Sequence, residues 1–140
     1  MAQKRFIAAI DGSELSSKVV DKAIMYASIF EAEIILVYCH RKFPTLLGAP
    51  YNDEAISSTL IEAEEVIRPY LVKLEKSGVK FSKRLMEEPP GTMISRVAEV
   101  ENVEMIIMGS RGLSNLEGLI VGSTTHKVLH LSSCPVLVVK

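Results

Sequence analysis

The residues best suited to chemistry in this sequence are small and polar, and they follow two apolar segments. Asp11-Gly12-Ser13 comes directly after Phe6 to Ile10, and Gly109-Ser110-Arg111-Gly112 comes directly after Met105 to Met108. Glycine lets backbone N–H groups approach a phosphate closely, and the ionised carboxylate of Asp11 can accept hydrogen bonds from ribose hydroxyls or bind a metal ion. These residue types predict a site for a phosphorylated ligand.

A third polar segment, Gly122-Ser123-Thr124-Thr125, opens a stretch with helical spacing. The first N–H groups of a helix have no partner within the helix and attract anions, and the three hydroxyls add further donors. Each segment taken alone fits a plainer interpretation, since Ser13 can cap a helix and Gly109 or Gly112 can open a turn. Their combination favours phosphate binding.

Five short segments rich in apolar and β-branched residues predict strands. Apolar residues recur with helical spacing between them, as at Ile56, Leu60 and Ala63. This alternation indicates an α/β fold, in which right-handed crossovers build an open parallel sheet with helices on both faces. Ligands bind such sheets at the carboxyl ends of the strands, where the polar segments fall. The predicted strands are Phe6 to Ile10, Ile34 to Cys39, Val79 to Leu85, Met105 to Met108 and Val136 to Val139.

Two of these strands carry information about the edges of the sheet. Val79 to Leu85 alternates and contains Lys80 and Lys83, which predicts an edge exposed to water. Val136 to Val139 is apolar throughout, so it either lies inside the sheet or forms an edge that another surface covers. A partner subunit is one candidate for that cover.

Two segments depart from regular patterns. Residues Lys42 to Asn52 have no periodicity and contain two prolines and a glycine, which predicts a long loop. Pro69 falls inside the helical stretch Asp53 to Lys76, and we expect it to kink or split that helix near Arg68.

Length and composition limit the class of protein. With 140 residues, 48% apolar and 24% charged, the chain predicts one globular domain over residues 1–140. A net charge of -1 disfavours nucleic acid as a partner, and the apolar runs are too short for a membrane span or a secretory signal. We therefore expect a cytoplasmic protein whose two cysteines, Cys39 and Cys134, are reduced.

The phosphate pattern resembles that of the ATP-binding class of universal stress protein domains. Two residues separate Gly109 from Gly112, and nine separate Gly112 from Gly122. The apolar run Ile106-Ile107-Met108 precedes the pattern, and Ser133 to Val139 follows it. This combination of glycine spacing and flanking strands is specific to that family.

The likeness extends to Ile10 to Ser16 at the end of the first strand and, in the order of elements, to essentially the whole chain. One departure is Met86 to Pro90, where the family commonly has a glycine before the third helix. The departure leaves the phosphate pattern intact. The resemblance implies a Rossmann-like sheet, similar to that of the adenine nucleotide α-hydrolases, with strand order 3-2-1-4-5.

The resemblance also implies roles for individual residues around ATP. Asp11 would contact the ribose, backbone beside Ala9, Ile10 and Cys39 would frame the adenine, and Met108 would line the pocket. A Mg²⁺ or Mn²⁺ ion would be held by the phosphates. The residues implied around the triphosphate are Gly109, Arg111, Gly112, Gly122, Ser123, Thr124 and Thr125.

A homodimer is implied as well. The family pairs its fifth strands across a two-fold axis, which corresponds here to Val136 to Val139. Such pairing would cover the apolar strand whose position the pattern alone leaves open.

Other kinds of site find less support. The sequence has no Gly-Lys-Ser/Thr motif, which a Walker A loop requires. His126 and His130 have the spacing of zinc ligands on a helix, but Lys127 stands where a zinc protease has glutamate and no third ligand is evident. Gly109 to Gly112 resembles the GXXG clamp of RNA-binding KH domains, yet it follows a strand instead of joining two helices.

Three functions remain open at this point. No His, Glu or Lys is evidently placed as a general base for water, which favours an ATP-binding regulatory or stress-response module. A second hypothesis is a slow ATPase or autophosphorylating enzyme that uses Ser110, Ser114, Ser123 or Thr124. A third is a structural dimer with an empty pocket.

Overall fold

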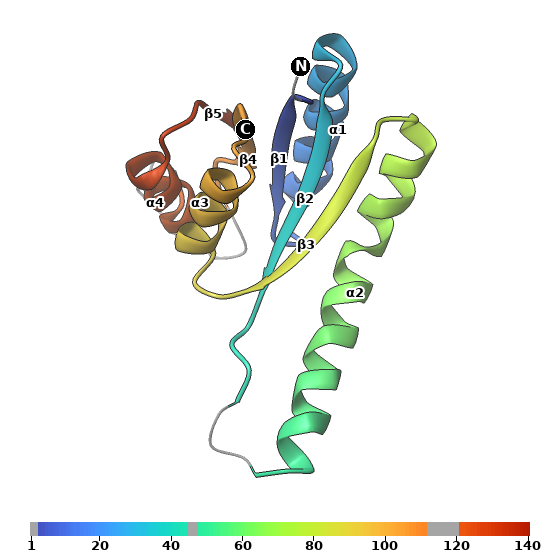
Figure 1. The fold of residues 1–140 in the computed structure, drawn as a ribbon, viewed down its shortest axis with the longest axis vertical. Coiled ribbons are helices and arrows are strands. Elements are labelled where there is room, and N and C mark those ends of the chain that lie inside the picture. Colours follow the sequence, from blue (N-terminus) through green and yellow to red (C-terminus); the bar gives the residue numbers. More distant parts are fainter. Residues whose placement is uncertain (1–2, 45–47, 112–120) are drawn as a thin grey trace.

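A computed structural model describes residues 3–44, 48–111 and 121–140 of the chain. Strands and helices alternate along these residues (Figure 1). The strands are β1 (Arg5–Ile10), β2 (Glu33–His40), β3 (Phe81–Glu87), β4 (Met105–Gly109) and β5 (Val136–Val139). The helices are α1 (Glu14–Phe30), α2 (Tyr51–Ser77), α3 (Pro90–Val100) and α4 (Ser123–Leu131).

The strands form one parallel sheet in the order β3-β2-β1-β4-β5, which confirms the predicted fold class and strand order. Helices α1 and α2 cover one face, and α3 and α4 cover the other (Figure 1). Phe6, Ala8 and Ile10 of β1 pack toward α1 and α2, whereas Ile7 and Ala9 pack toward α3 and α4. The central strand is thus buried on both faces, as expected for a parallel sheet between two helix layers.

The two edges of the sheet differ in character. Residues Ser82 to Arg84 of β3 are exposed, which confirms the predicted water-exposed edge. Strand β5 forms the other edge and pairs with β4 on one side. Its residues Val136 to Val138 are half-buried, so this edge presents an apolar row.

Strand β3 begins and ends later than predicted, at Phe81 and Glu87. The reason lies in the preceding turn, where Gly78 caps α2 in a left-handed conformation and the Val79 N–H donates to Ser77 Oγ at 3.1 Å. Val79 therefore serves the turn that ends the helix and lies outside the strand.

Helix α2 differs from two expectations. It begins at Tyr51, so the end of the predicted loop over residues 42–52 is helical. It also continues through Pro69 as one helix, so the predicted split is wrong, while the predicted kink near Arg68 stays a prediction. Proline removes one backbone hydrogen bond, but Ile67 and Leu74 are buried on either side of it and hold both halves against the sheet. The first half of α2 extends past the carboxyl ends of the strands (Figure 1). Neither α2 nor any other helix in the described part of the chain is long and apolar enough to cross a membrane.

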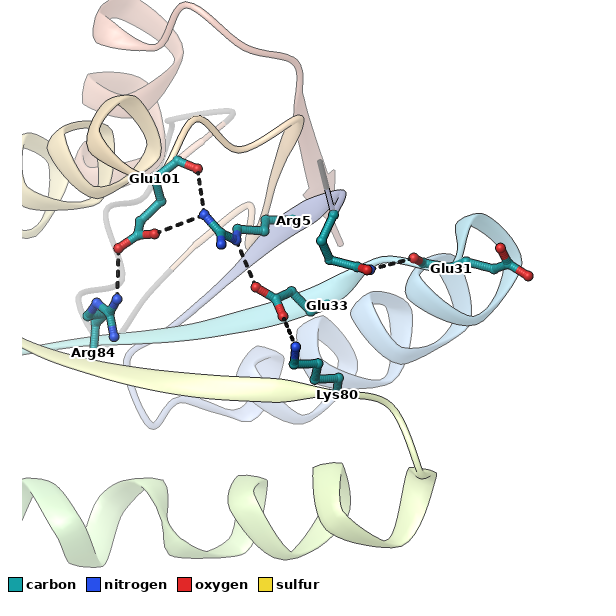
Figure 2. A network of polar contacts seen from close by, with 7 residues as sticks. Arg5, Glu31, Glu33, Lys80, Arg84 and Glu101 are labelled. Carbon is teal, nitrogen blue, oxygen red and sulfur yellow. Dashed lines mark hydrogen bonds and ion pairs between the residues drawn. The ribbon is translucent and has the colours of Figure 1, made fainter. Parts of the chain in front are cut away.

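An ion-pair network joins the amino ends of the strands (Figure 2). Arg5 Nε lies 2.7 Å from Glu33 Oε1, and Arg5 Nη1 lies 3.3 Å from Glu101 Oε2. Lys80 Nζ reaches Glu33 Oε2 at 3.4 Å, and Arg84 Nη2 reaches Glu101 Oε1 at 2.7 Å. The network links β1, β2, β3 and the end of α3.

Glu101 gives this network a dependence on pH. The hydrogen bond from Arg84, reinforced by the charges of Arg84 and Arg5, lowers the pKa of Glu101 from its ordinary 4.5, against the opposing effect of burial. A lowered pKa means that the ionised carboxylate stabilises the folded state above pH 4.5 and that this contribution is lost as the pH falls through the lowered pKa.

We expect Glu101→Gln to reduce the free energy of unfolding at neutral pH by about 1 kcal/mol or less, since exposed ion pairs contribute little. The difference from the parent protein should shrink as the pH falls below 4.5. Urea denaturation across this pH range measures it. Glu99→Gln, at an exposed position of the same helix, is the control. If the loss of unfolding free energy in Glu101→Gln stayed constant with pH, the pKa of Glu101 would not be lowered by the network.

Candidate functional site

A cavity of about 440 Å³ opens at the carboxyl ends of β1, β2 and β4, a volume typical of small-molecule sites. It lies at the point where crossovers from the adjacent strands β1 and β4 leave in opposite directions. Of the twelve residues implied around ATP, Gly112 falls outside the described residues. The other eleven line this cavity: Ala9, Ile10, Asp11, Cys39, Met108, Gly109, Arg111, Gly122, Ser123, Thr124 and Thr125.

The amino end of α4 faces this cavity. The first helical hydrogen bond runs from the His126 N–H to the Gly122 carbonyl at 2.9 Å, so the N–H groups of residues 123–125 have no acceptor within the helix. Gly122 occupies the N-cap position and supplies no side-chain cap. Free N–H groups at the partly positive end of a helix form a favourable place for an anion.

The Thr125 hydroxyl serves the fold. Thr125 is 2% exposed, and its Oγ1 donates to the Gly109 carbonyl at 2.7 Å. The Gly122 N–H donates to the Ser110 carbonyl, also at 2.7 Å. These bonds hold the start of α4 against the end of β4. Only the backbone of Thr125 therefore remains for a ligand, whereas Ser123 and Thr124 keep more accessible hydroxyls.

The two described glycines of the phosphate pattern have different reasons to be glycine. A Cβ added to Gly109 would lie 3.2 Å from Leu15 Cβ and 3.2 Å from the Arg111 carbonyl oxygen, so a side chain there fits only if these neighbours shift by a few tenths of an ångström. Gly122 has φ -70° and ψ 167°, a conformation that any residue adopts. Its backbone conformation therefore gives no reason for a glycine.

Asp11 is held by the turn between β1 and α1. Its Oδ1 accepts hydrogen bonds from the Ser13 N–H at 2.9 Å and from Ser16 Oγ at 3.2 Å. Ser13 stands at the N-cap position of α1, but its side chain makes no capping bond, so the segment forms the turn of the plainer interpretation without the side-chain cap. Among the described residues nothing donates to Asp11 Oδ2.

Carboxylates gather at the β2 end of the cavity. Burial raises the pKa of Tyr38, and the nearby charges of Asp11, Glu62 and Glu88 raise it further. Burial, followed by the charge of Glu88, raises the pKa of Cys39 to about 12. The Cys39 thiol is therefore neutral at physiological pH and poorly nucleophilic.

Sequence reasoning missed the contribution of α2 to this cavity. Thr59, Glu62 and Ala63 line it, and Arg41 lies 3.4 Å from both Thr59 Oγ1 and Glu62 Oε2. Helical periodicity places Ala63 on the buried side of α2, but it gives no sign of how far the helix overlaps the strand ends. The remaining lining residues outside the pattern are Ser13, Leu15, Ser16, Val19, Tyr38, His40, Glu88, Pro90 and Ile94.

We expect Gly109→Ala to lower the free energy of unfolding by about 1–3 kcal/mol, because the new methyl group overpacks the contact with Leu15. Urea denaturation without any ligand measures this loss. Gly48→Ala is the matched control, since no described atom lies within 4 Å of its added Cβ. Equal stability of the two variants would show that the β4–α1 contact yields easily.

Comparison with known proteins gives a consistent family. The family model described as Universal stress protein family matches residues 3–140. Universal stress protein MJ0531 of Methanocaldococcus jannaschii is 33% identical over 139 residues, covering 98% of this chain and 82% of that protein. Universal stress protein YxiE of Bacillus subtilis is 31% identical, covering 97% and 98%.

Solved structures agree with this result. The structure of MJ0577, from Methanocaldococcus jannaschii, has a TM-score of 0.86 and 28% identity over 100% of this chain and 97% of that one. A universal stress protein in complex with cAMP has a TM-score of 0.75 and 23% identity, covering 100% and 99%. An Arabidopsis thaliana universal stress protein family protein with AMP bound has a TM-score of 0.71 and 13% identity, covering 98% and 91%. The last two similarities concern the fold alone.

Proposed function

This chain belongs to the universal stress protein family, and on that premise we propose that it binds ATP at the carboxyl ends of β1 and β4 as a nucleotide-dependent regulatory module. The observation that carries the proposal is the meeting, in one cavity, of the Asp11 carboxylate and the amino end of α4, where Gly122 supplies no side-chain cap. The amino end of the helix suits phosphate, and the carboxylate suits ribose hydroxyls.

The charges of the cavity favour one orientation of the nucleotide. Strand β1 lies between β2 and β4, so Asp11 stands between the carboxylates near β2 and the α4 amino end near β4. Carboxylates repel phosphate and accept hydrogen bonds from amino and hydroxyl groups. The phosphates therefore lie at α4, with any Mg²⁺ or Mn²⁺ bound to them, the ribose at Asp11 and the base near β2.

The end of β2 provides backbone for the base. The pairing of β1 with β2 ends at Ile10 and Tyr38, so Cys39 lies beyond the end of β1. If the ladder continued, the Gly12 N–H would donate to the Cys39 carbonyl. It donates to Ser16 Oγ instead and is not available to β2. Within the described part of the chain the Cys39 carbonyl is thus open to a base, and apolar side chains such as Met108 and Ile94 line the same cavity. The nucleotides named for two structural neighbours, cAMP and AMP, both contain adenine.

A regulatory role suits the positions of the acid–base groups. His40, Glu62 and Glu88 belong to the β2 side of the cavity, whereas the phosphates are assigned to β4. Parallel strands lie about 4.8 Å apart, so about 10 Å separates the end of β2 from the end of β4. A group held at the β2 end is too far from the phosphates for proton transfer to an attacking water. Two free cysteines suit the reducing cytoplasm, where we expect the module to act.

We expect the purified protein to release adenine nucleotide when it is denatured, or, if it is isolated empty, to gain thermal stability with millimolar ATP and magnesium. Gly122→Val should abolish both effects, because its side chain would stand among the N–H groups that meet the phosphates. Chromatography of the released nucleotide and thermal melting measure them. Gly48→Val, outside the cavity, should behave as the parent protein does. A parent protein with no nucleotide and no thermal shift would contradict the proposal.

The apolar edge at β5 suits a homodimer. Val136 to Val138 are half-buried, and α4, which contacts β5, carries the exposed side chains of Leu129 and Leu131. An unpaired edge also presents backbone N–H and carbonyl groups that a second strand can satisfy. Two copies related by a two-fold axis would bring identical edges together and close the assembly at a dimer.

We expect Val138→Asp to convert the dimer to monomers. Pairing of two β5 edges would bury a carboxylate from each subunit in an apolar interface, and burying an unpaired charge is costly. Light scattering measures the mass, and circular dichroism checks that the variant is folded. Val100→Asp, at an exposed valine on α3, should leave the mass unchanged. A folded Val138→Asp protein with the parent mass would place the interface elsewhere.

A further inference from the structure

Ser16 makes an unusual set of hydrogen bonds for a helical serine. A serine inside a helix can donate back to the preceding turn, as Ser28 does to the Ile24 carbonyl and Ser95 to the Gly91 carbonyl. Ser16 lies in the first turn of α1 and is only 2% exposed, yet its hydroxyl faces the end of β1.

The Ser16 hydroxyl connects three groups of the turn at the cavity. It accepts the N–H groups of Asp11 and Gly12, both at 3.1 Å, and donates to Asp11 Oδ1 at 3.2 Å. Two donors on one hydroxyl polarise it and strengthen its own donation to the carboxylate. With the Ser13 N–H on the same oxygen, Asp11 Oδ1 is held from two sides.

We propose that Ser16 is the positioning residue that aims Asp11 at the ribose and so makes the site select nucleotides that carry ribose hydroxyls. The inference rests on the proposed function. Ser16 acts through Asp11, since the hydrogen bonds on Oδ1 leave Oδ2 open to the ligand among the described residues. A carboxylate that is held in place before binding loses little conformational entropy when it accepts hydrogen bonds from ribose hydroxyls. This preorganisation raises the affinity for ligands that carry those hydroxyls.

The selectivity should be measurable as a ratio of affinities. A hydrogen bond to a charged group is worth roughly tenfold or more in binding. We therefore expect the parent protein to bind ATP at least about tenfold more tightly than 2′,3′-dideoxy-ATP. In Ser16→Ala the ratio should fall toward unity, chiefly through weaker ATP binding. Titration calorimetry with both nucleotides in the presence of magnesium measures the ratio.

Two comparisons separate positioning from a general effect on the fold. Ser17→Ala removes the neighbouring hydroxyl, which accepts from Lys73 between α1 and α2 and does not line the cavity, so the ratio should stay at the parent value. Asp11→Ala should remove the selectivity by itself. Adding Ser16→Ala to Asp11→Ala should change the ratio no further, because Ser16 acts only through that carboxylate.

Each outcome decides the matter. If the parent protein binds neither nucleotide, the proposed function fails. If it binds both equally, or if folded Ser16→Ala keeps the parent ratio, the positioning role is overturned while ATP binding stands. Should Ser16→Ala fail to fold, Ser16→Cys fills the same space with a poor hydrogen-bonding group and is measured in its place. A parent ratio in Ser16→Cys would equally overturn the role.

Discussion

The site depends on how the peptide groups that follow β4 are held. The Ser110 N–H donates to the Val139 carbonyl, and the Ser110 carbonyl accepts from the Gly122 N–H, both at 2.7 Å. Because a buried peptide group must find partners, these bonds tie together β4, β5 and the start of α4. The Thr125 hydroxyl adds a third tie, to Gly109. The anion-attracting end of α4 is thereby fixed at the carboxyl end of β4, beside Asp11.

The sheet itself gives the cavity its polarity. Each of three adjacent strands brings a different chemistry to the same edge: carboxylates near β2, the held Asp11 after β1, and helical N–H groups beside β4. This order follows from the connectivity of the fold, since parallel strands deliver all their carboxyl ends to one side. A linear ligand whose ends differ in charge matches such an edge in only one direction.

Much of this could be predicted from the sequence, and the failures have a common cause. The strand order follows from the family resemblance. The meeting of Asp11 with Gly122 follows from the rule that parallel strands bring their carboxyl ends to one edge. Both predictions need only short sequence motifs and the alternation of strands and helices. The partner of the Thr125 hydroxyl and the overlap of α2 with the strand ends depend on how elements pack, which periodicity does not encode. The continuity of α2 through Pro69 also depends on packing, because the buried residues on both sides stabilise the helix more than one lost hydrogen bond destabilises it.

The network around Arg5, drawn in Figure 2, lies at the amino ends of β1 and β2, whereas the cavity lies at their carboxyl ends. Ion-pair networks of this kind stabilise the fold more at high temperature, because the free-energy cost of removing ions from water falls as the temperature rises. Substitutions there can adapt a lineage to heat or cold while the cavity keeps its residues. Thermal adaptation and ligand choice can therefore evolve separately within this one sheet.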